Sequence, residues 1–171
     1  GNNSKKIEDV VFSDDYSEPL FEILGAQKAE SIDYSNYEKA TIIHDKNLPF
    51  PSELKGRFTG VVDGGTLEHI FNFPEAIKNC MTALKTGGHF IGITPVNNLM
   101  GHGFYQFSPE LYYRIFSEAN GFVVKKMFIT SDDNMSNKAR WFEVTDPVKV
   151  KDRVTLVNQK PLYLMVLAQK I

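Results

Sequence analysis

Apolar runs and amphipathic helical patterns alternate through the middle of the chain. Apolar runs bounded by turn residues predict strands, and apolar positions three and four residues apart predict helices. The predicted strands lie at 28–33, at 40–44, around Val61 and Val62, and at 89–94, 122–130 and 161–169. The predicted helices lie at 18–24, 74–84 and 108–120. Such alternation is typical of crossover units that build a mainly parallel α/β sheet.

Capping and breaking residues mark several predicted boundaries. Ser108 before Pro109 is a favourable start for a helix, and Gly121 follows its predicted end. The glycine pair 87–88 is predicted to close the helix at 74–84. Pro95 is predicted to end the strand that comes next.

The last two predicted strands, 122–130 and 161–169, have no helical pattern between them. We therefore expect them to form an antiparallel pair at a sheet edge. The segment between them, 131–160, is long and polar, and its Trp-Phe-Glu-Val stretch at 141–144 predicts an extra short strand or a lid over the site. The expected organisation is one domain over 1–171, with 131–160 as an insertion or lid.

Composition and charge exclude several classes of protein. The 171 residues are 42% hydrophobic and 23% charged, which predicts one soluble domain with a single core. The formal charge of -2, from 19 basic and 21 acidic residues, gives no reason to expect nucleic acid or a membrane as partner. No apolar stretch has the length of a membrane span, and no signal peptide is expected. The expected location is cytoplasmic.

The cysteine and histidine residues give little sign of metal or thiol chemistry. Cys80 is the one cysteine, so an internal disulfide is excluded, and in a helical pattern an inert, partly buried thiol is the usual case. The histidines, His44, His69, His89 and His102, do not have the spacing of helix-borne zinc ligands, so no metal site is predicted. The absence of a Gly-x-Gly-x-x-Gly motif after a strand disfavours a nicotinamide dehydrogenase.

The segment after the strand around Val61 is the first candidate for a binding site. The apolar run ends in Asp63, Gly64 and Gly65 and passes into Leu-Glu-His at 67–69. In open α/β sheets, ligands bind beyond the carboxyl ends of the strands, and glycine lets the backbone approach a ligand or turn with positive φ. The alternative is a plain strand-to-helix turn without a ligand.

The order of these motifs resembles that of a known family. Asp-Gly-Gly-Thr-Leu-Glu-His at 63–69, a helix, and Leu-Lys-Thr-Gly-Gly at 84–88 are similar to the second half of bacterial class I S-adenosylmethionine-dependent methyltransferases. The likeness extends from Glu18 to Ile171 and includes His-Gly-Phe-Tyr-Gln-Phe at 102–107. It implies an α/β, three-layer Rossmann-like methyltransferase fold. In that family the sheet has strand order 3-2-1-4-5-7-6, with the last strand antiparallel.

The resemblance also implies positions that hold the cofactor, S-adenosylmethionine. Asp33 and Tyr34 come at the end of the strand similar to the second, where the family places an acid on the ribose hydroxyls. Asp45 follows the next strand, where an acid often binds the adenine amino group. The Gly64-Gly65-Thr66 segment falls where the backbone approaches the methionine end. The alternatives are a simple turn at Asp33 and Tyr34 and a solvated acid at Asp45.

The glycine-rich loop that follows the family's first strand, Asp/Glu-x-Gly-x-Gly-x-Gly, is missing. The expected position has the sequence Ser-Asp-Asp-Tyr-Ser at 13–17. The segment 7–12 is the candidate for the first strand, which is then degenerate or truncated. Asp14 and Asp15 could attract the ammonium of the cofactor but would repel its carboxylate, and the lost backbone donors would weaken the site further.

His69, His102 and Tyr105 are the candidate catalytic residues. Methyl transfer to a hydroxyl or amine needs alignment and in some cases a base, and histidine titrates near neutral pH. The alternatives are a bracing role together with Glu68 for His69, and a surface or hydrogen-bonding role for His102. The predicted function is S-adenosylmethionine-dependent methyl transfer to a small-molecule or glycan acceptor. The alternative is a methyltransferase-fold binding or scaffolding protein that has lost cofactor binding.

Overall fold

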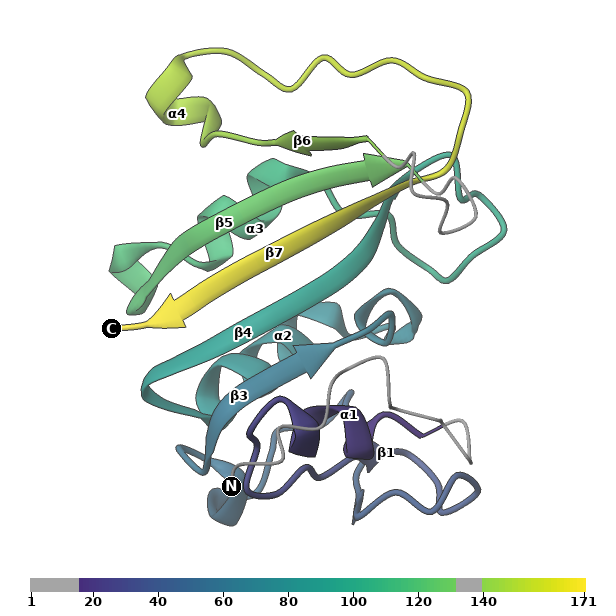
Figure 1. Cartoon of the computed structure of the whole chain (residues 1–171), viewed down its shortest axis with the longest axis vertical. Helices are drawn as coiled ribbons and strands as arrows, with labels where there is room; N and C mark the ends of the chain where they lie inside the picture. Colours follow the sequence, from purple (N-terminus) through teal and green to yellow (C-terminus); the bar gives the residue numbers. More distant parts are fainter. Residues whose placement is uncertain (1–15, 132–139) are drawn as a thin grey trace, which may run out of the picture. The chain divides into compact units, whose positions relative to one another are not determined.

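The computed structural model describes residues 16–131 and 140–171. It divides into two compact units, 1–45 and 46–171 (Figure 1). The predicted first strand at 7–12, and Asp14 and Asp15 after it, lie outside the described residues. In the described ranges, no helix is both long and apolar enough to cross a lipid bilayer.

The first unit contains one short helix and one pair of parallel strands. They are helix α1 (Glu18–Ile23) and strands β1 (Ile32–Asp33) and β2 (Ile42–Ile43). Gly25 follows the helix with a φ of +100°, in agreement with its predicted role as a stop. The strands are shorter than predicted, and just before them the Thr41 hydroxyl forms hydrogen bonds with the backbone of Ser31. Its Oγ1 accepts from the Ser31 N–H at 2.7 Å and donates to the Ser31 carbonyl at 3.0 Å.

The second unit contains a five-stranded sheet in the order β3-β4-β7-β5-β6. The strands are β3 (Phe58–Asp63), β4 (Leu84–Asn97), β5 (Phe122–Ser131), β6 (Trp141–Glu143) and β7 (Leu162–Lys170). β3 and β4 are parallel, whereas β7 is antiparallel to both of its neighbours, β4 and β5. In the family's numbering, β3, β4, β5 and β7 are strands 4, 5, 6 and 7. The observed order therefore confirms the 4-5-7-6 part of the implied order and the antiparallel last strand. β6 pairs with β5, so the stretch predicted as a strand or a lid contains a strand.

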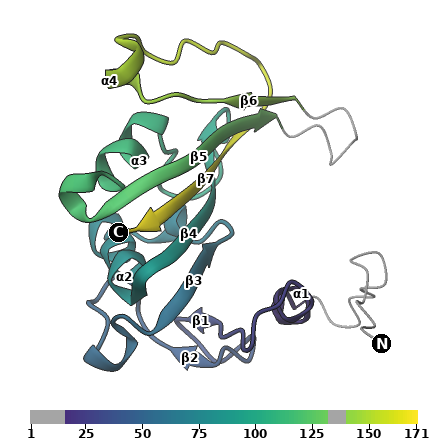
Figure 2. The same cartoon turned by 60° about the vertical axis from the view of Figure 1, so that its left-hand side comes forward.

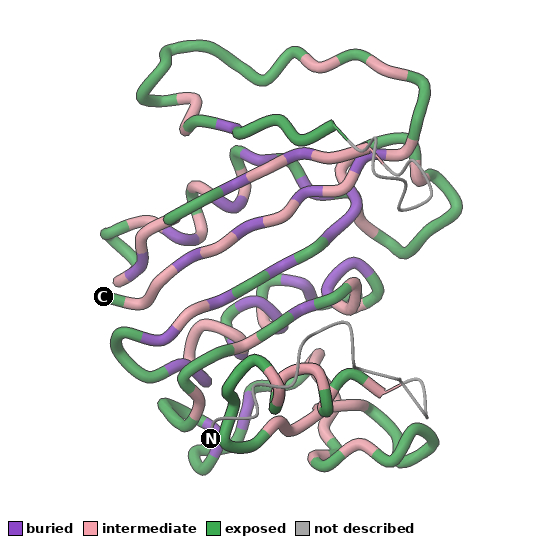
Figure 3. Tube along the Cα trace, viewed as in Figure 1, coloured by how far each residue is buried: buried purple, intermediate pink, exposed green. Residues whose placement is uncertain are grey.

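Two helices pack on the same face of this sheet (Figure 2). They are α2 (Phe73–Ala83) and α3 (Pro109–Ile115). The connecting segments contain the short helix α4 (Pro147–Val150) and the 3-10 turns η2 (Ser52–Leu54), η3 (Leu67–His69) and η4 (Glu118–Asn120). Burial alternates along β7, from Leu162 to Ala168 (Figure 3), because successive side chains of a strand point to opposite faces. The buried side chains join α2 and α3 to the strands in one core.

Burial raises the pKa of Cys80, on α2, to about 12, so this thiol stays protonated near neutral pH.

The predicted boundary between α2 and β4 is wrong. The helix ends at Ala83 and the strand begins at Leu84, so the glycine pair 87–88 lies inside β4 and does not close the helix. Donors from other segments bind the last carbonyl oxygens of the helix. Lys170 Nζ donates to those of Met81 at 3.0 Å and of Leu84 at 2.8 Å, and the N–H groups of Gly56 and Arg57 donate to those of Thr82 and Ala83. They replace the donors that a glycine turn would otherwise provide.

Pro95 does not end β4, as predicted, but lies within it. The pairing of β4 with β3 stops at Gly92. At Pro95 this edge faces a loop, because the Pro95 carbonyl accepts from the Phe107 N–H at 2.8 Å. A residue's N–H and C=O point to the same side of a strand, so the missing N–H of proline costs no ladder bond here.

The helix predicted over 108–120 is divided in two. Ser108 caps α3 as predicted, since its Oγ accepts from the Leu111 N–H at 3.3 Å. The helix ends at Ile115, where the Asn120 side-chain amide donates to the Ile115 carbonyl at 2.9 Å. η4 then completes the segment before Gly121, whose φ is +75°.

Candidate functional site

The parallel strands β3 and β4 bring two loops to the same edge of the sheet. η3 follows β3 after Asp63, and the loop 98–107 follows β4. The backbone N–H of Phe104, in the second loop, donates to the carbonyl of Glu68, in η3, at 2.7 Å. The two segments that carry the predicted catalytic residues are therefore in direct contact.

A buried glutamate lies where these loops meet. The side chain of Glu68 is 2% exposed, and its Oε1 lies 3.3 Å from Nε2 of His102, whose side chain is 46% exposed. The rings of His69 and His102 meet edge-on, with centroids 4.8 Å apart. Two histidines that are far apart in the sequence thus share the neighbourhood of one carboxylate. A buried carboxylate beside an imidazole can fix the ring's orientation and stabilise its protonated form.

Glycines on both sides make room for Glu68. A Cβ on Gly103 would lie 2.8 Å from the Glu68 carbonyl oxygen, and one on Gly65 would lie 3.2 Å from its Oε1. Both glycines have positive φ, +72° and +103° respectively, which other residues adopt only with strain. The approach of the two loops therefore depends on glycine at these positions.

Replacing Gly103 with alanine is expected to separate the loops. The positive φ costs about 1 to 2 kcal/mol for an L-residue, and the new Cβ would collide with the Glu68 carbonyl. Hydrogen exchange of the Phe104 amide, which donates to that carbonyl, should then become faster. Gly101→Ala is the matched control, because a Cβ there meets nothing within 4 Å and φ is not positive. Equal exchange rates in the two variants would contradict this account of the loop.

Asp63 holds the turn from β3 into η3. Its Oδ1 accepts from the N–H groups of Thr66 at 3.1 Å and Leu67 at 3.3 Å. Burial raises the pKa of Asp63 to about 6; the nearby charge of Glu68 adds to this shift, while the two backbone hydrogen bonds oppose it. Among the described residues, Asp63 Oδ2 and Glu68 Oε2 are buried without a hydrogen-bond partner. Buried polar atoms of this kind need a proton, a water or a cation as partner.

Tyr105 has a structural role in this loop. Its hydroxyl donates to the carbonyl of Phe71 at 2.7 Å. Its ring stacks with that of Phe107 at a centroid distance of 5.9 Å and lies near that of Phe73. These contacts fix the loop 98–107 against the segment after η3. A catalytic role for Tyr105 stays a prediction, and it would require the hydroxyl proton to leave this hydrogen bond.

The residues predicted for the cofactor are divided between the two units. Asp33, Tyr34 and Asp45 belong to 1–45, and the Gly64-Gly65-Thr66 segment belongs to 46–171. Asp33 Oδ1 accepts from the Ser35 N–H at 2.9 Å, which is the turn that the sequence offered as an alternative. Tyr34 is exposed and Asp45 is half-buried. Their contact with a cofactor stays a prediction.

The backbone at Gly64 fits the close approach of a ligand. Gly64 is exposed, and a Cβ built on it would meet nothing within 4 Å. Its neighbour Gly65 has the positive φ discussed above, so the chain turns sharply beside an open position. This geometry is compatible with the cofactor contact that the resemblance implies for the segment.

Sequence reasoning missed the central position of Glu68 and the burial of Asp63. The sequence offered a bracing role for Glu68, but not its contact with His102. The available signal was the Leu-Glu-His motif directly after a strand, since a 3-10 turn there directs one side chain inward and the next outward. Glu68 is buried and His69 is exposed.

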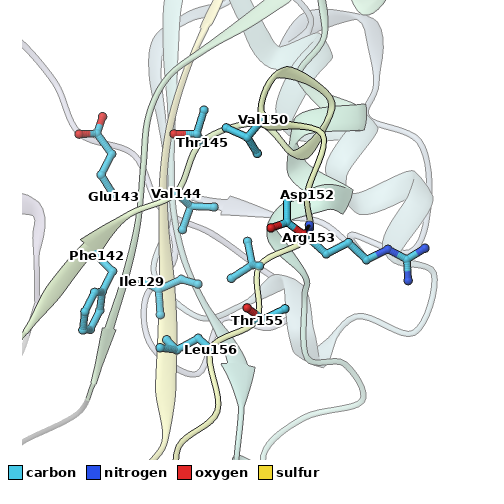
Figure 4. Close-up of a pocket in the computed structure, with 11 residues that line it drawn as sticks. Ile129, Phe142, Glu143, Val144, Thr145, Val150, Asp152, Arg153, Thr155 and Leu156 are labelled. Carbon is cyan, nitrogen blue, oxygen red and sulfur yellow. Dashed lines mark hydrogen bonds between the residues drawn. The ribbon is translucent and has the colours of Figure 1, made fainter.

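A cavity of about 450 Å³ lies elsewhere in the second unit, beside β5, β6 and the segment after α4 (Figure 4). Ile129, Val144 and Leu156 line it with apolar surface, and Asp152 and Arg153 add charged groups. None of the predicted catalytic or cofactor residues lines it. The prediction that 131–160 forms a lid over the site stays a prediction.

Comparisons with known proteins identify the fold. No protein-family model matches the sequence, and no curated protein matches it. Among solved structures, a candidate methyltransferase from Bacillus halodurans C-125 is 14% identical with a TM-score of 0.53, over 82% of this chain and 80% of the other. The MccD protein is 15% identical with a TM-score of 0.50, over 82% and 78%. The chain therefore has the mixed α/β, Rossmann-like fold of class I methyltransferases.

Proposed function

We propose that the chain transfers a methyl group from S-adenosylmethionine to a hydroxyl or amine of a small-molecule or glycan acceptor. The observation that carries the proposal is the Glu68–His102 pair, because it places an oriented imidazole at the carboxyl edge of parallel strands in a methyltransferase fold. Ligands of open α/β sheets bind at this edge.

The chain's own residues would orient the acceptor and remove its proton. With Nε2 of His102 facing Glu68 Oε1, Nδ1 is the atom that accepts the proton of the acceptor hydroxyl or amine. The buried carboxylate then stabilises the imidazolium that forms. The cofactor would supply the methyl group as a sulfonium. The open backbone at Gly64 would take its methionine end, and the resemblance implies Asp33 for its ribose hydroxyls.

Calorimetric titration of the full chain with S-adenosylmethionine and S-adenosylhomocysteine tests the cofactor directly. We expect both to bind, and Asp33→Ala to weaken binding about tenfold, or about 1.4 kcal/mol. Asp33→Asn is the matched control, because asparagine keeps the Oδ1 acceptor of the Ser35 turn and loses only the charge. Similar weakening in both variants assigns the effect to the carboxylate, and weakening in Asp33→Ala alone assigns it to the turn.

A second candidate function is a binding or scaffolding module that has lost the cofactor. The observation that favours it is the sequence Ser-Asp-Asp-Tyr-Ser at 13–17, in place of the family's glycine-rich loop. Failure of both compounds to bind at millimolar concentration would support this candidate and exclude the transferase.

A further inference from the structure

We propose that Glu68, His69 and His102 form a site for a divalent transition-metal ion of the Zn²⁺ type. One ligand atom from each side chain lies within 4.8 Å of the others. Imidazole nitrogen and carboxylate oxygen are ligands that Zn²⁺ prefers, and three protein ligands with an open fourth position are typical of its catalytic sites. The proposal does not depend on methyl transfer.

One edge of the coordination tetrahedron is already formed. With metal–ligand bonds of about 2.0 to 2.1 Å, the ligand atoms of a tetrahedral site lie about 3.3 Å apart. Glu68 Oε1 and His102 Nε2 are separated by 3.3 Å. His69 is exposed, and a rotation of its ring would close the remaining edges.

The buried carboxylate supplies an independent reason for a cation. The Glu68 side chain is 2% exposed, and its Oε2 is a buried oxygen without a hydrogen-bond partner. Burying a carboxylate is costly unless its charge is paired. An exposed imidazole at 3.3 Å pairs this charge only when it is protonated, whereas a metal ion bound to the carboxylate would pair it directly. Asp63 adds a second negative group that interacts with Glu68.

The loops hold Glu68 and His102 close together before any ion arrives. Gly103 and Gly65 lie against Glu68 from the two loops, and the Phe104 N–H bonds the Glu68 carbonyl at 2.7 Å. The neighbour of Gly103 in the sequence is His102, so the hydrogen bond that fixes the loop also restrains the backbone that carries this ligand. A site whose loops already lie close together loses less conformational entropy on binding.

A bound ion would change how the site handles protons. His102 would no longer be available as a base, because a neutral imidazole that ligates through Nε2 carries its proton on Nδ1 and has no free nitrogen to accept another. The open position would take water or an acceptor oxygen and lower its pKa, so the proton would leave from the metal-bound oxygen. The metal-free and metal-loaded forms therefore differ in which group activates the acceptor.

Titration of the EDTA-treated full chain with Zn²⁺ alone, followed by calorimetry, tests the site. We expect one ion per chain with a micromolar or lower dissociation constant, and Co²⁺ in its place should give the visible absorption of a tetrahedral complex. Glu68→Gln, His69→Gln and His102→Gln should each weaken binding at least tenfold. His89→Gln, a histidine of β4 outside the cluster, should leave the affinity unchanged.

The result that overturns the proposal is weak or multiple binding, or equal affinity in wild type, His69→Gln and His102→Gln. His69 and His102 are solvent-accessible, so their variants keep the test informative if Glu68→Gln does not fold. Because no cofactor is present, a negative result here leaves the cofactor titration unaffected. A positive result likewise leaves open which of the two proposed functions the chain has.

Discussion

Replacing Phe90 with alanine is expected to lower the free energy of unfolding by about 3 to 5 kcal/mol, the range for removing a fully buried aromatic ring. Phe90 lies on β4 with an exposed fraction of 0%. Its ring centroid is 4.9 Å from that of Phe116, and it covers Gly92, where an added Cβ would lie 2.8 Å from the ring. The contacts join the sheet to the end of α3, so the cavity cannot collapse easily.

Urea denaturation of wild type and Phe90→Ala measures this loss. Ile91→Ala is the matched control, because Ile91 is the next residue on β4, points to the opposite face and is 39% exposed. We expect it to cost clearly less than Phe90→Ala. Equal losses in the two variants would show that the buried face of the sheet is not where the described structure places it.

Above pH 6, the buried charge of Asp63 is expected to lower the free energy of unfolding by about 3 kcal/mol, and Asp63→Asn should remove this loss. The pKa of Asp63 is raised from 3.8 to about 6 by burial, and each pKa unit corresponds to about 1.4 kcal/mol. Between pH 4 and 6 the folded chain therefore binds more protons at this residue than the unfolded chain. Its contribution to stability is full below pH 4 and is lost as the pH rises through 6.

The comparison of wild type and Asp63→Asn should isolate this residue. Asparagine keeps the Oδ1 acceptor for Thr66 and Leu67 and places an uncharged amide where Oδ2 has no partner. The variant should gain stability relative to wild type as the pH increases from 4 to 7, in denaturation series with EDTA present. Parallel stability curves for the two proteins would rule out a raised pKa. Glu68 raises this pKa and Lys46 lowers it, so both charges must be kept.

Local signals in the sequence predicted the elements better than their ends. Ser108 and Gly25 act where they were predicted to act, because caps and positive-φ positions depend on neighbouring backbone alone. The predicted junction after Ala83 was wrong because the donors there come from distant residues, Lys170 in the final strand and the backbone of Gly56 and Arg57. The prediction that Pro95 ends the strand was wrong for a similar reason. A proline fits within β4 because the pairing with β3 stops before it.

The candidate site also combines local signals, which the sequence contains, with contacts between distant segments, which it does not show. The sequence marked His69 and His102 separately, since a strand followed by glycines and polar residues is a local pattern. It could not show that Glu68 is buried between them, because that depends on the register of β3 against β4 and on the Phe104–Glu68 hydrogen bond. The sequence by itself determined the α/β alternation, the antiparallel last strand and the edge where chemistry is expected. Only the tertiary structure decided which side chains meet there, because contacts between distant segments are set by packing and burial rather than by local propensity.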